Sequence, residues 1–135
     1  MFTTKGRYAL RVMIDLAEHE DSGYIPLKEI AERQMISEKY LESILKSLVR
    51  AELLKGLRGK GGGYILTRKP SEYPVGEIIE IVEGTLASVA CLTSDAEPCE
   101  KASNCQTLPL WQNLDKIVHD YLYTVTIADL VNKNV

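Results

Sequence analysis

The chain has 135 residues, of which 45% are hydrophobic and 26% charged, and its formal net charge is -3. This size fits one compact unit, or a small domain with an oligomerisation arm. Uncharged runs such as residues 84–94 are too short and too mixed to span a bilayer, and the N-terminal residues lack the apolar core of a signal peptide, so we expect a cytoplasmic protein outside the membrane.

The net charge conceals a difference between the two halves of the chain. Residues 1–70 carry 13 Lys and Arg against 9 Asp and Glu, a net +4, whereas residues 71–135 carry 3 against 10, a net -7. A basic first half favours contact with a polyanion, although charges in these numbers can also simply solvate helix faces.

Apolar side chains at helical spacing predict three helices in the first half, at residues 3–20, 26–34 and 38–51. Thr3 and Ser37 are suited to cap the first and third helices, Pro26 fits the first turn of the second, and Tyr24-Ile25 is long enough only for a short strand. A short helix, a tight turn and a longer helix with a polar outer face are typical of a helix-turn-helix.

Two short apolar runs, residues 53–57 and 63–67, flank the sequence Arg58-Gly59-Lys60-Gly61-Gly62. They predict a β-hairpin with a glycine-rich, cationic tip, and a hairpin directly after a helix-turn-helix is a wing. A phosphate-binding loop is the competing interpretation, but the Lys-Ser or Lys-Thr ending is absent and no helix follows, so we expect no bound nucleotide.

The second half predicts a short helix from Val75 to Glu83 closed by Gly84, a long helix over residues 108–125 and a last turn over residues 127–131 capped by Thr126. The long helix carries a heptad seam that we expect to pack on the same helix of a second subunit, although it could pack on its own domain instead. The seam residues are Trp111, Leu114, Val118, Tyr121 and Val125.

The predicted fold is therefore mainly α, a winged helix-turn-helix domain with a two-stranded wing plus a long C-terminal dimerisation helix. The expected divisions are a DNA-binding domain (1–83), a cysteine-containing cluster-binding loop (84–107) and a dimerisation helix with a C-terminal turn (108–135).

All three cysteines of the chain, Cys91, Cys99 and Cys105, fall in a segment without helical or strand periodicity. Thiolates on a flexible loop are typical ligands of iron-sulfur clusters and zinc. The C-x7-C-x5-C spacing fits neither a zinc ribbon nor a bacterial ferredoxin, and free or reversibly oxidised thiols remain the alternative.

Three stretches, KGRYAL (5–10), SEKYLESILKSL (37–48) and LRGKGGGYIL (57–66), resemble the IscR/NsrR/CymR family of winged-helix regulators. The resemblance implies a homodimer with crossed C-terminal helices, in which Cys91, Cys99 and Cys105 bind a 2Fe-2S or 4Fe-4S cluster that controls DNA binding. IscR-like members have a histidine where this chain has Leu108, and NsrR-like members have an aspartate where it has Tyr8.

The fourth cluster ligand is therefore unassigned. It could come from the other subunit, from a small molecule, or from one of five side chains of this chain: Asp95, Glu97, Glu100, His19 and His119.

The resulting prediction is a dimeric repressor that reads a palindromic operator in double-stranded DNA. Its contacts are expected from polar and cationic residues of the first helix, the third helix and the hairpin tip: Lys5, Arg7, Ser37, Glu38, Lys39, Glu42, Lys46, Arg50, Arg58 and Lys60. Arg58 is expected in the minor groove and the start of the third helix in the major groove. Glu42 either accepts a hydrogen bond from a cytosine amine or pairs with Lys46.

Three other functions compete with this prediction. A cluster-free regulator could respond to a partner protein or to thiol oxidation, and a small electron-transfer protein is a more remote alternative. An enzyme is not expected, because two histidines and no nucleophile motif leave no catalytic constellation.

Overall fold

The computed structural model describes residues 2–88 and 105–135. In chain order its elements, with η for a 3-10 helix, are α1 (Thr4–Glu18), η1 (Glu20–Ser22), α2 (Leu27–Gln34), α3 (Glu38–Arg50), β1 (Leu54–Leu57), β2 (Gly63–Leu66), η2 (Pro70–Glu72), α4 (Val75–Glu83), α5 (Leu108–Thr124) and α6 (Ile127–Val131). We call residues 53–67 the wing, and residues 2–52 and 68–83 together with α6 the head. The predicted winged helix-turn-helix with a long C-terminal helix is confirmed.

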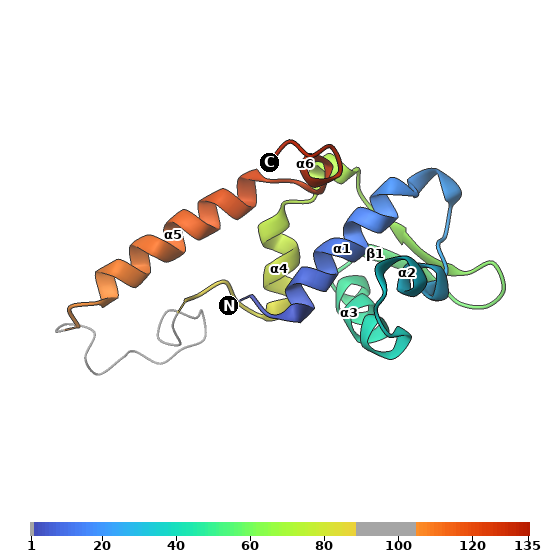
Figure 1. Cartoon of the computed structure of the whole chain (residues 1–135), viewed down its shortest axis with the longest axis horizontal. Coiled ribbons are helices and arrows are strands. Elements are labelled where there is room, and N and C mark those ends of the chain that lie inside the picture. The colour runs from blue at the N-terminus through green and yellow to red at the C-terminus, as the bar shows by residue number, and fades with distance from the viewer. Residues whose placement is uncertain (1, 89–104) are drawn as a thin grey trace.

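Helix α1 runs through the middle of the head, and α2, α3, α4, α6 and β2 all pack on it (Figure 1). Its apolar side chains recur at helical spacing, and Ala9, Val12 and Met13 are fully buried. Ile127 of α6 is buried in the same core. The last helix of the chain therefore packs against α1, the first helix.

A charged pair joins α1 to the helix-turn-helix. The Asp15 side chain is buried and accepts hydrogen bonds from Arg33 Nε and Nη2 at 3.0 and 2.7 Å and from Gln34 Nε2 at 2.9 Å. Burial by itself raises the pKa of Asp15, but the bonds from Arg33 and Gln34 outweigh it and hold the pKa below its ordinary value. The end of α2 is thereby fixed against α1, immediately before the turn that leads to α3.

That turn is made by a left-handed residue and a side-chain cap. Met35 ends α2 with φ of 58°, and the Ser37 hydroxyl accepts a hydrogen bond from the Tyr40 amide at 3.2 Å. The predicted cap of α3 is confirmed. Because the cap satisfies one of the first amides of the helix, it fixes where α3 begins.

The wing is an antiparallel hairpin in which Leu54 pairs with Leu66 and Leu57 with Gly63. Its second strand is also paired with the head, since Tyr64 and Ile25 exchange two backbone hydrogen bonds of 2.9 Å. Gly63 has φ of 146°, and a Cβ atom there would lie 2.2 Å from the Ile25 carbonyl oxygen. Glycine at this position therefore lets the wing approach the head closely.

The Tyr73 hydroxyl joins both strands at the base of the wing. It donates to the Leu53 carbonyl at 2.8 Å and accepts from the amides of Thr67 at 2.8 Å and Arg68 at 2.9 Å. The Tyr73 side chain is fully buried. The residue before β1 and the residues after β2 are thus held on one oxygen atom, which sets the direction of the hairpin.

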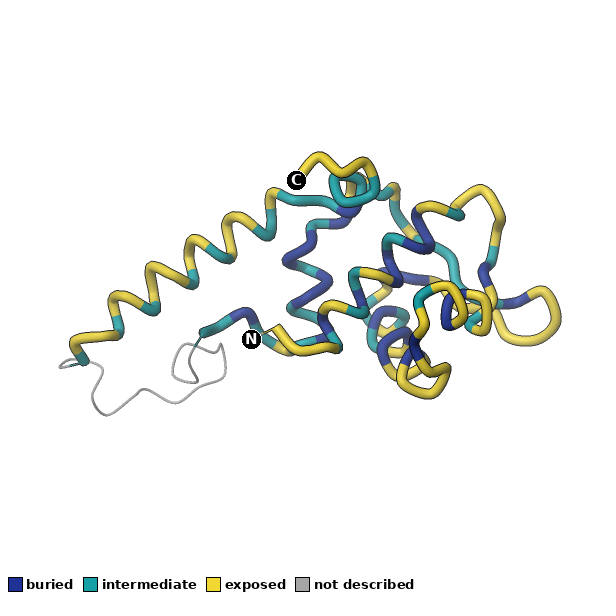
Figure 2. Tube along the Cα trace, viewed as in Figure 1, coloured by how far each residue is buried: buried dark blue, intermediate teal, exposed yellow. Residues whose placement is uncertain are grey.

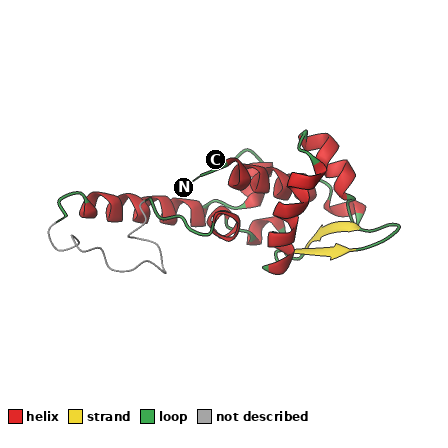
Figure 3. Ribbon diagram, turned by 90° about the horizontal axis from the view of Figure 1, so that it is seen from below, coloured by secondary structure: helices red, strands yellow, loops and turns green. Residues whose placement is uncertain are grey.

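Helix α5 leaves the head at one end, opposite the wing (Figure 3). Its last turns rest on α4, where Tyr123 occupies the space over Gly76: a Cβ atom at residue 76 would lie 2.4 Å from the Tyr123 ring. Burial, with the carboxylate of Glu80 nearby, raises the pKa of Tyr123 to about 12. The remainder of α5 projects beyond the head, and none of its residues is buried (Figure 2).

Several predicted boundaries shift by a few residues. The first helix ends at Glu18 rather than residue 20, because His19 leaves the helical conformation and its Nδ1 lies 2.8 Å from the Asp15 carbonyl oxygen. Pro26 precedes α2 instead of lying inside it, and the short strand at Tyr24-Ile25 is a single bridge from Ile25 to Tyr64. Helix α5 stops at Thr124, one residue earlier than predicted.

None of the helices in residues 2–88 and 105–135 combines the length and apolarity needed to cross a membrane.

Replacing Tyr73 with Phe is expected to lower the free energy of unfolding by roughly 2–3 kcal/mol, because two amides and one carbonyl lose their partner at the base of the wing. Urea unfolding monitored by circular dichroism measures the change. The matched control is Tyr24→Phe, at a half-buried tyrosine outside this network, and equal stabilities of the two variants would contradict the role given to Tyr73.

Candidate nucleic-acid interface and cysteine segment

Helix α3 presents a cationic face to solvent. Its buried stripe is Leu41, Ile44, Leu45 and Leu48. Lys39, Lys46 and Arg50 lie on the opposite face, because separations of 7 and 11 residues are close to whole numbers of helical turns. All three are exposed. The charged side chains predicted for this helix therefore point away from the core, as DNA contact requires.

The wing tip is also exposed. Arg58, Gly59, Lys60 and Gly61 are all accessible, and none of them is covered by the head. The two cations thus lie at the end of a hairpin whose base is held by Tyr73, so the structure brings the two predicted wing residues together at one projecting tip.

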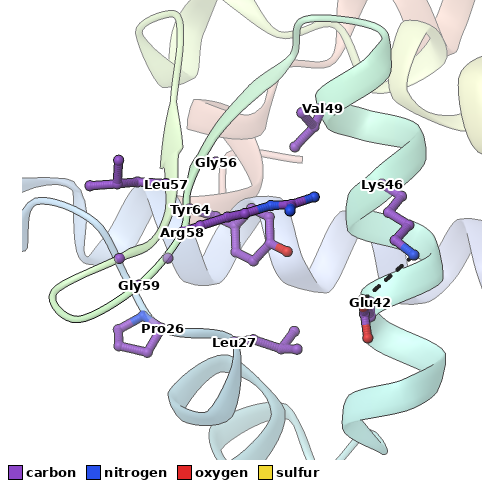
Figure 4. A pocket seen from close by; sticks show the side chains of 12 residues that line it. Pro26, Leu27, Glu42, Lys46, Val49, Gly56, Leu57, Arg58, Gly59 and Tyr64 are labelled. Atoms are coloured by element: carbon purple, nitrogen blue, oxygen red, sulfur yellow. Dashed lines mark ion pairs between the residues drawn. The ribbon is translucent and has the colours of Figure 1, made fainter.

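A groove of about 580 Å³ separates α3 from the wing (Figure 4). Glu42, Lys46 and Val49 line it from α3, and Leu57, Arg58 and Tyr64 line it from the wing. The Glu42 carboxylate lies 3.6 Å from Lys46 Nζ, which is the ion pair considered from the sequence. Tyr64 was not predicted as a site residue. Its position after the three glycines, residues 61–63, does not indicate a binding role, because the groove forms only when the wing folds beside α3.

The two predicted contacts on α1 occupy different places. Lys5 lies one turn before Tyr8, whose ring contacts Tyr40 edge-on at 5.7 Å, so Lys5 is on the side of α1 nearest the start of α3. Arg7 instead lines an apolar hollow of about 330 Å³ with Phe2, Tyr121 and other residues at the root of α5. The structure does not bring Arg7 to the groove beside the wing.

Two other arginines of the basic half are used inside the head. Arg33 binds Asp15, and Arg11 donates to both the side-chain and the backbone oxygen of Gln34. The positive charge of the first half is therefore divided between structural pairs and the exposed α3 and wing surface.

The cysteine segment is only partly within the described residues. Cys91 and Cys99 lie outside them, as do the ligand candidates Asp95, Glu97 and Glu100. Cys105 is half-buried just before α5, with its Sγ atom 3.4 Å from the Thr107 hydroxyl. Either group can be the donor at this distance, so the Thr107 hydroxyl is able to donate to a thiolate at Cys105.

The beginning of this segment is bonded to two helices of the described structure. The Glu83 carboxylate, just before the segment, accepts from the Thr3 amide and hydroxyl and from the Gly6 amide at the start of α1. Burial raises the pKa of Glu83, yet these hydrogen bonds outweigh it and leave the pKa below its ordinary value. A few residues later, the Ser88 amide donates to Asp115 of α5 at 3.0 Å.

The two histidines lie away from Cys105. His19 ends α1 beside Asp15, and the ring of His119 stacks on Tyr123 with centroids 4.4 Å apart. His119 is eleven residues into α5, about 16 Å along the axis from its first residue. Within the ranges 2–88 and 105–135, no three His, Cys, Asp or Glu side chains are placed to hold a metal ion.

The predicted seam on α5 divides into two groups. Trp111, Val118 and Val125 are half-covered, and Val125 packs with Val75 and Ile79 of its own head, whereas Leu114 and Tyr121 are exposed. The large exposed apolar residues of α5 form a stripe at 4-3-4 spacing: Leu110, Leu114, Ile117 and Tyr121. Leu110 and Ile117 fit the same heptad periodicity but were missed, because periodicity alone does not show which side faces the head.

Comparisons with known proteins agree with this arrangement. The family model Rrf2, described as an iron-dependent transcriptional regulator, matches residues 2–133. The HTH-type transcriptional regulator IscR of Serratia proteamaculans (strain 568) is 39% identical over 130 residues, which are 96% of this chain and 78% of that protein.

Two solved structures share the fold over nearly their whole length. CymR, the global cysteine regulator of B. subtilis, has a TM-score of 0.78 and 36% identity, covering 98% of this chain and 97% of that one. IscR of T. potens has a TM-score of 0.76 and 36% identity, covering 100% and 88%. These relatives confirm the resemblance inferred from the sequence and the expectation of a regulator rather than an enzyme. The chain belongs to the Rrf2 family of transcriptional regulators.

Proposed function

We propose that this chain is a homodimeric repressor that binds a palindromic operator in double-stranded DNA, and that an iron-sulfur cluster held by Cys91, Cys99 and Cys105 controls its affinity. The observation that carries the proposal is the exposed cationic surface that continues from α3 to the wing tip in a member of this family. Such a surface neutralises phosphates, which supply most of the affinity of a protein for DNA.

Each part of this surface has a defined role in the complex. Helix α3 enters the major groove, where Lys39 and Arg50 meet phosphates and Glu42 faces base edges. The wing places Arg58 in the neighbouring minor groove, whose narrow A·T tracts attract a guanidinium group. Backbone contacts therefore set the position of the head, and the two groove contacts read the sequence.

Replacing Arg58 with Ala is expected to weaken duplex binding roughly tenfold or more and to lower the salt dependence of affinity by about one ion, because one cation leaves the DNA. Fluorescence anisotropy over a series of salt concentrations measures both quantities on the tightest duplex selected by the wild type from a random pool. Lys133→Ala, which removes the same charge beyond α6, is the control, and equal losses in both variants would contradict a specific role for Arg58.

The proposed dimer forms along α5. This helix of 17 residues projects from the head with no buried residue and an apolar stripe along its length. A projecting apolar stripe at heptad spacing is stabilised by a second helix laid along it. A two-fold axis there would present two heads to the same side of the DNA, which requires an operator of two half-sites.

Ile117→Glu is expected to convert the dimer to a monomer and to weaken operator binding strongly, because a carboxylate would be buried against the partner helix. Sedimentation velocity gives the oligomeric state. Gln112→Glu adds the same charge at an exposed polar position of α5 and is expected to remain dimeric. A dimeric Ile117→Glu protein would show that the stripe is not the interface.

The proposed cluster has Cys91, Cys99 and Cys105 as its protein ligands. When bound, such a cluster supplies a centre that responds to oxidants, diatomic gases and iron supply. The role of the chain is to hold the segment that carries these thiols, with Glu83 bonded to the start of α1 and Ser88 to α5. Because α5 also carries the proposed dimer interface, the state of the segment can alter how the two heads are presented.

Anaerobically reconstituted wild type is expected to bind iron and sulfide and to differ from Cys99→Ala in operator affinity by a factor of roughly 5 to 150, the usual range of coupling between sites. Iron and sulfide assays, absorption spectra and anisotropy measure the two properties. Ser103→Ala changes a neighbouring residue without removing a thiol and is the control. Identical operator affinities of loaded wild type and Cys99→Ala would refute control by the cluster.

A second candidate is a regulator without a cluster, which responds to a partner protein or to thiol oxidation. The similarity to CymR favours it, since that protein is the global cysteine regulator of B. subtilis. The same assays separate the two candidates. Absence of bound iron together with a change of operator affinity on mild thiol oxidation would support the second.

A further inference from the structure

The groove between α3 and the wing contains a tyrosine, Tyr64, that the contacts proposed above leave unused. The Tyr64 ring lines this groove from the wing, as Arg58 does, and Glu42 and Lys46 line it from α3 (Figure 4). The ring packs beside Gly56, where a Cβ atom would lie 3.4 Å from Tyr64 Cε1. The ring is half-buried against the edge of the core, and its hydroxyl is directed toward α3 (Figure 4).

The position of this groove follows from DNA geometry. If α3 lies in the major groove and the wing in the adjacent minor groove, one sugar-phosphate backbone must run between them. The surface that faces this backbone is the groove that separates α3 from the wing. Its depth and its glycine-lined wing side leave space for a phosphodiester.

The charges lining the groove suit an anion there. Lys46 and Arg58 supply two cations, and the single carboxylate, Glu42, is already paired with Lys46 at 3.6 Å. Burial raises the pKa of Tyr64, the charge of Glu42 raises it further, and Arg58 acts in the opposite direction. The hydroxyl thus stays protonated at neutral pH and can donate a hydrogen bond.

We propose that this groove binds one phosphate of the DNA strand running between the major and minor grooves, with the Tyr64 hydroxyl donating a hydrogen bond to a phosphate oxygen and Lys46 as its neighbouring cation. The inference rests on the proposed DNA-binding function. It assigns a phosphate site to a residue that the sequence did not single out.

The backbone of Tyr64 is held more firmly than that of the wing tip. Its amide and carbonyl pair with Ile25 at 2.9 Å each, and its strand pairs with β1 through Gly56. The Tyr64 hydroxyl is carried by a backbone that is fixed to both the wing and the head. It can therefore set the distance between α3 and the DNA backbone, because little conformational freedom is lost when the phosphate binds.

The test compares Tyr64→Phe with wild type on the selected duplex and on a scrambled duplex of the same composition. The variant is expected to bind both duplexes roughly tenfold more weakly, because one hydrogen bond to a charged group is lost without a change in base contacts. Its salt dependence should equal that of wild type, whereas Lys46→Gln should lower the salt dependence by about one ion. Tyr24→Phe, next to Ile25 but outside the groove lining, should bind as wild type.

A second measurement uses wild-type protein and duplexes in which single phosphates are replaced by neutral methylphosphonates. One position in each half-site, between the major-groove and minor-groove footprints, should weaken binding, and this effect should be smaller in Lys46→Gln and Tyr64→Phe. The inference would be overturned if Tyr64→Phe bound both duplexes as wild type does, or if its loss of affinity were confined to the selected duplex. It would also be overturned if no single methylphosphonate between the two footprints weakened binding by wild type. Each of these results leaves duplex binding by wild type intact. Failure of wild type to bind any duplex would overturn the proposed function itself.

Discussion

The arrangement of the wing depends on one buried hydroxyl group. Tyr73 Oη is bonded to the Leu53 carbonyl and to the amides of Thr67 and Arg68, so it closes the hairpin at its base. A two-stranded hairpin is only marginally stable by itself. With this anchor, and with Ile25 paired to Tyr64, the wing is fixed to the head, and its tip has a defined position relative to α3. A protein that contacts both grooves of DNA needs a fixed distance between α3 and the wing tip, because the major and minor grooves lie at a fixed spacing.

Direct contacts within the head fix the position of α3 relative to α1. Glu83 caps the start of α1, and one to two turns later Tyr8 meets Tyr40 in the first turn of α3. Asp15 then fixes the end of α2 through Arg33. The segment that carries the cysteines begins next to Glu83, so it is joined to α3 through packed and bonded contacts as well as through the chain. This is a physical route by which a bound cluster could influence DNA affinity.

Helix α5, unlike the wing, is held to the head only at one end. Its final turns are held by packing of Tyr123 over Gly76, while Leu114 and Ile117 of the apolar stripe are exposed in the part of the chain that the structure describes. Such a stripe contributes no burial free energy when the isolated chain folds, and pairing with a second copy would add that contribution. In the dimer proposed above, the stability of the protein and its oligomeric state would therefore be coupled.

Local patterns in the sequence determined the helices, the glycine-tipped hairpin and the cationic side of α3, because caps such as Ser37 and apolar spacing act over only a few residues. Tertiary structure alone decided that Arg33 binds a buried aspartate, that Tyr73 closes the wing, and that Arg7 lies away from the groove. These outcomes depend on residues far apart in the chain, as Thr3 and Glu83 are, and no short-range pattern records which distant partner a side chain will meet.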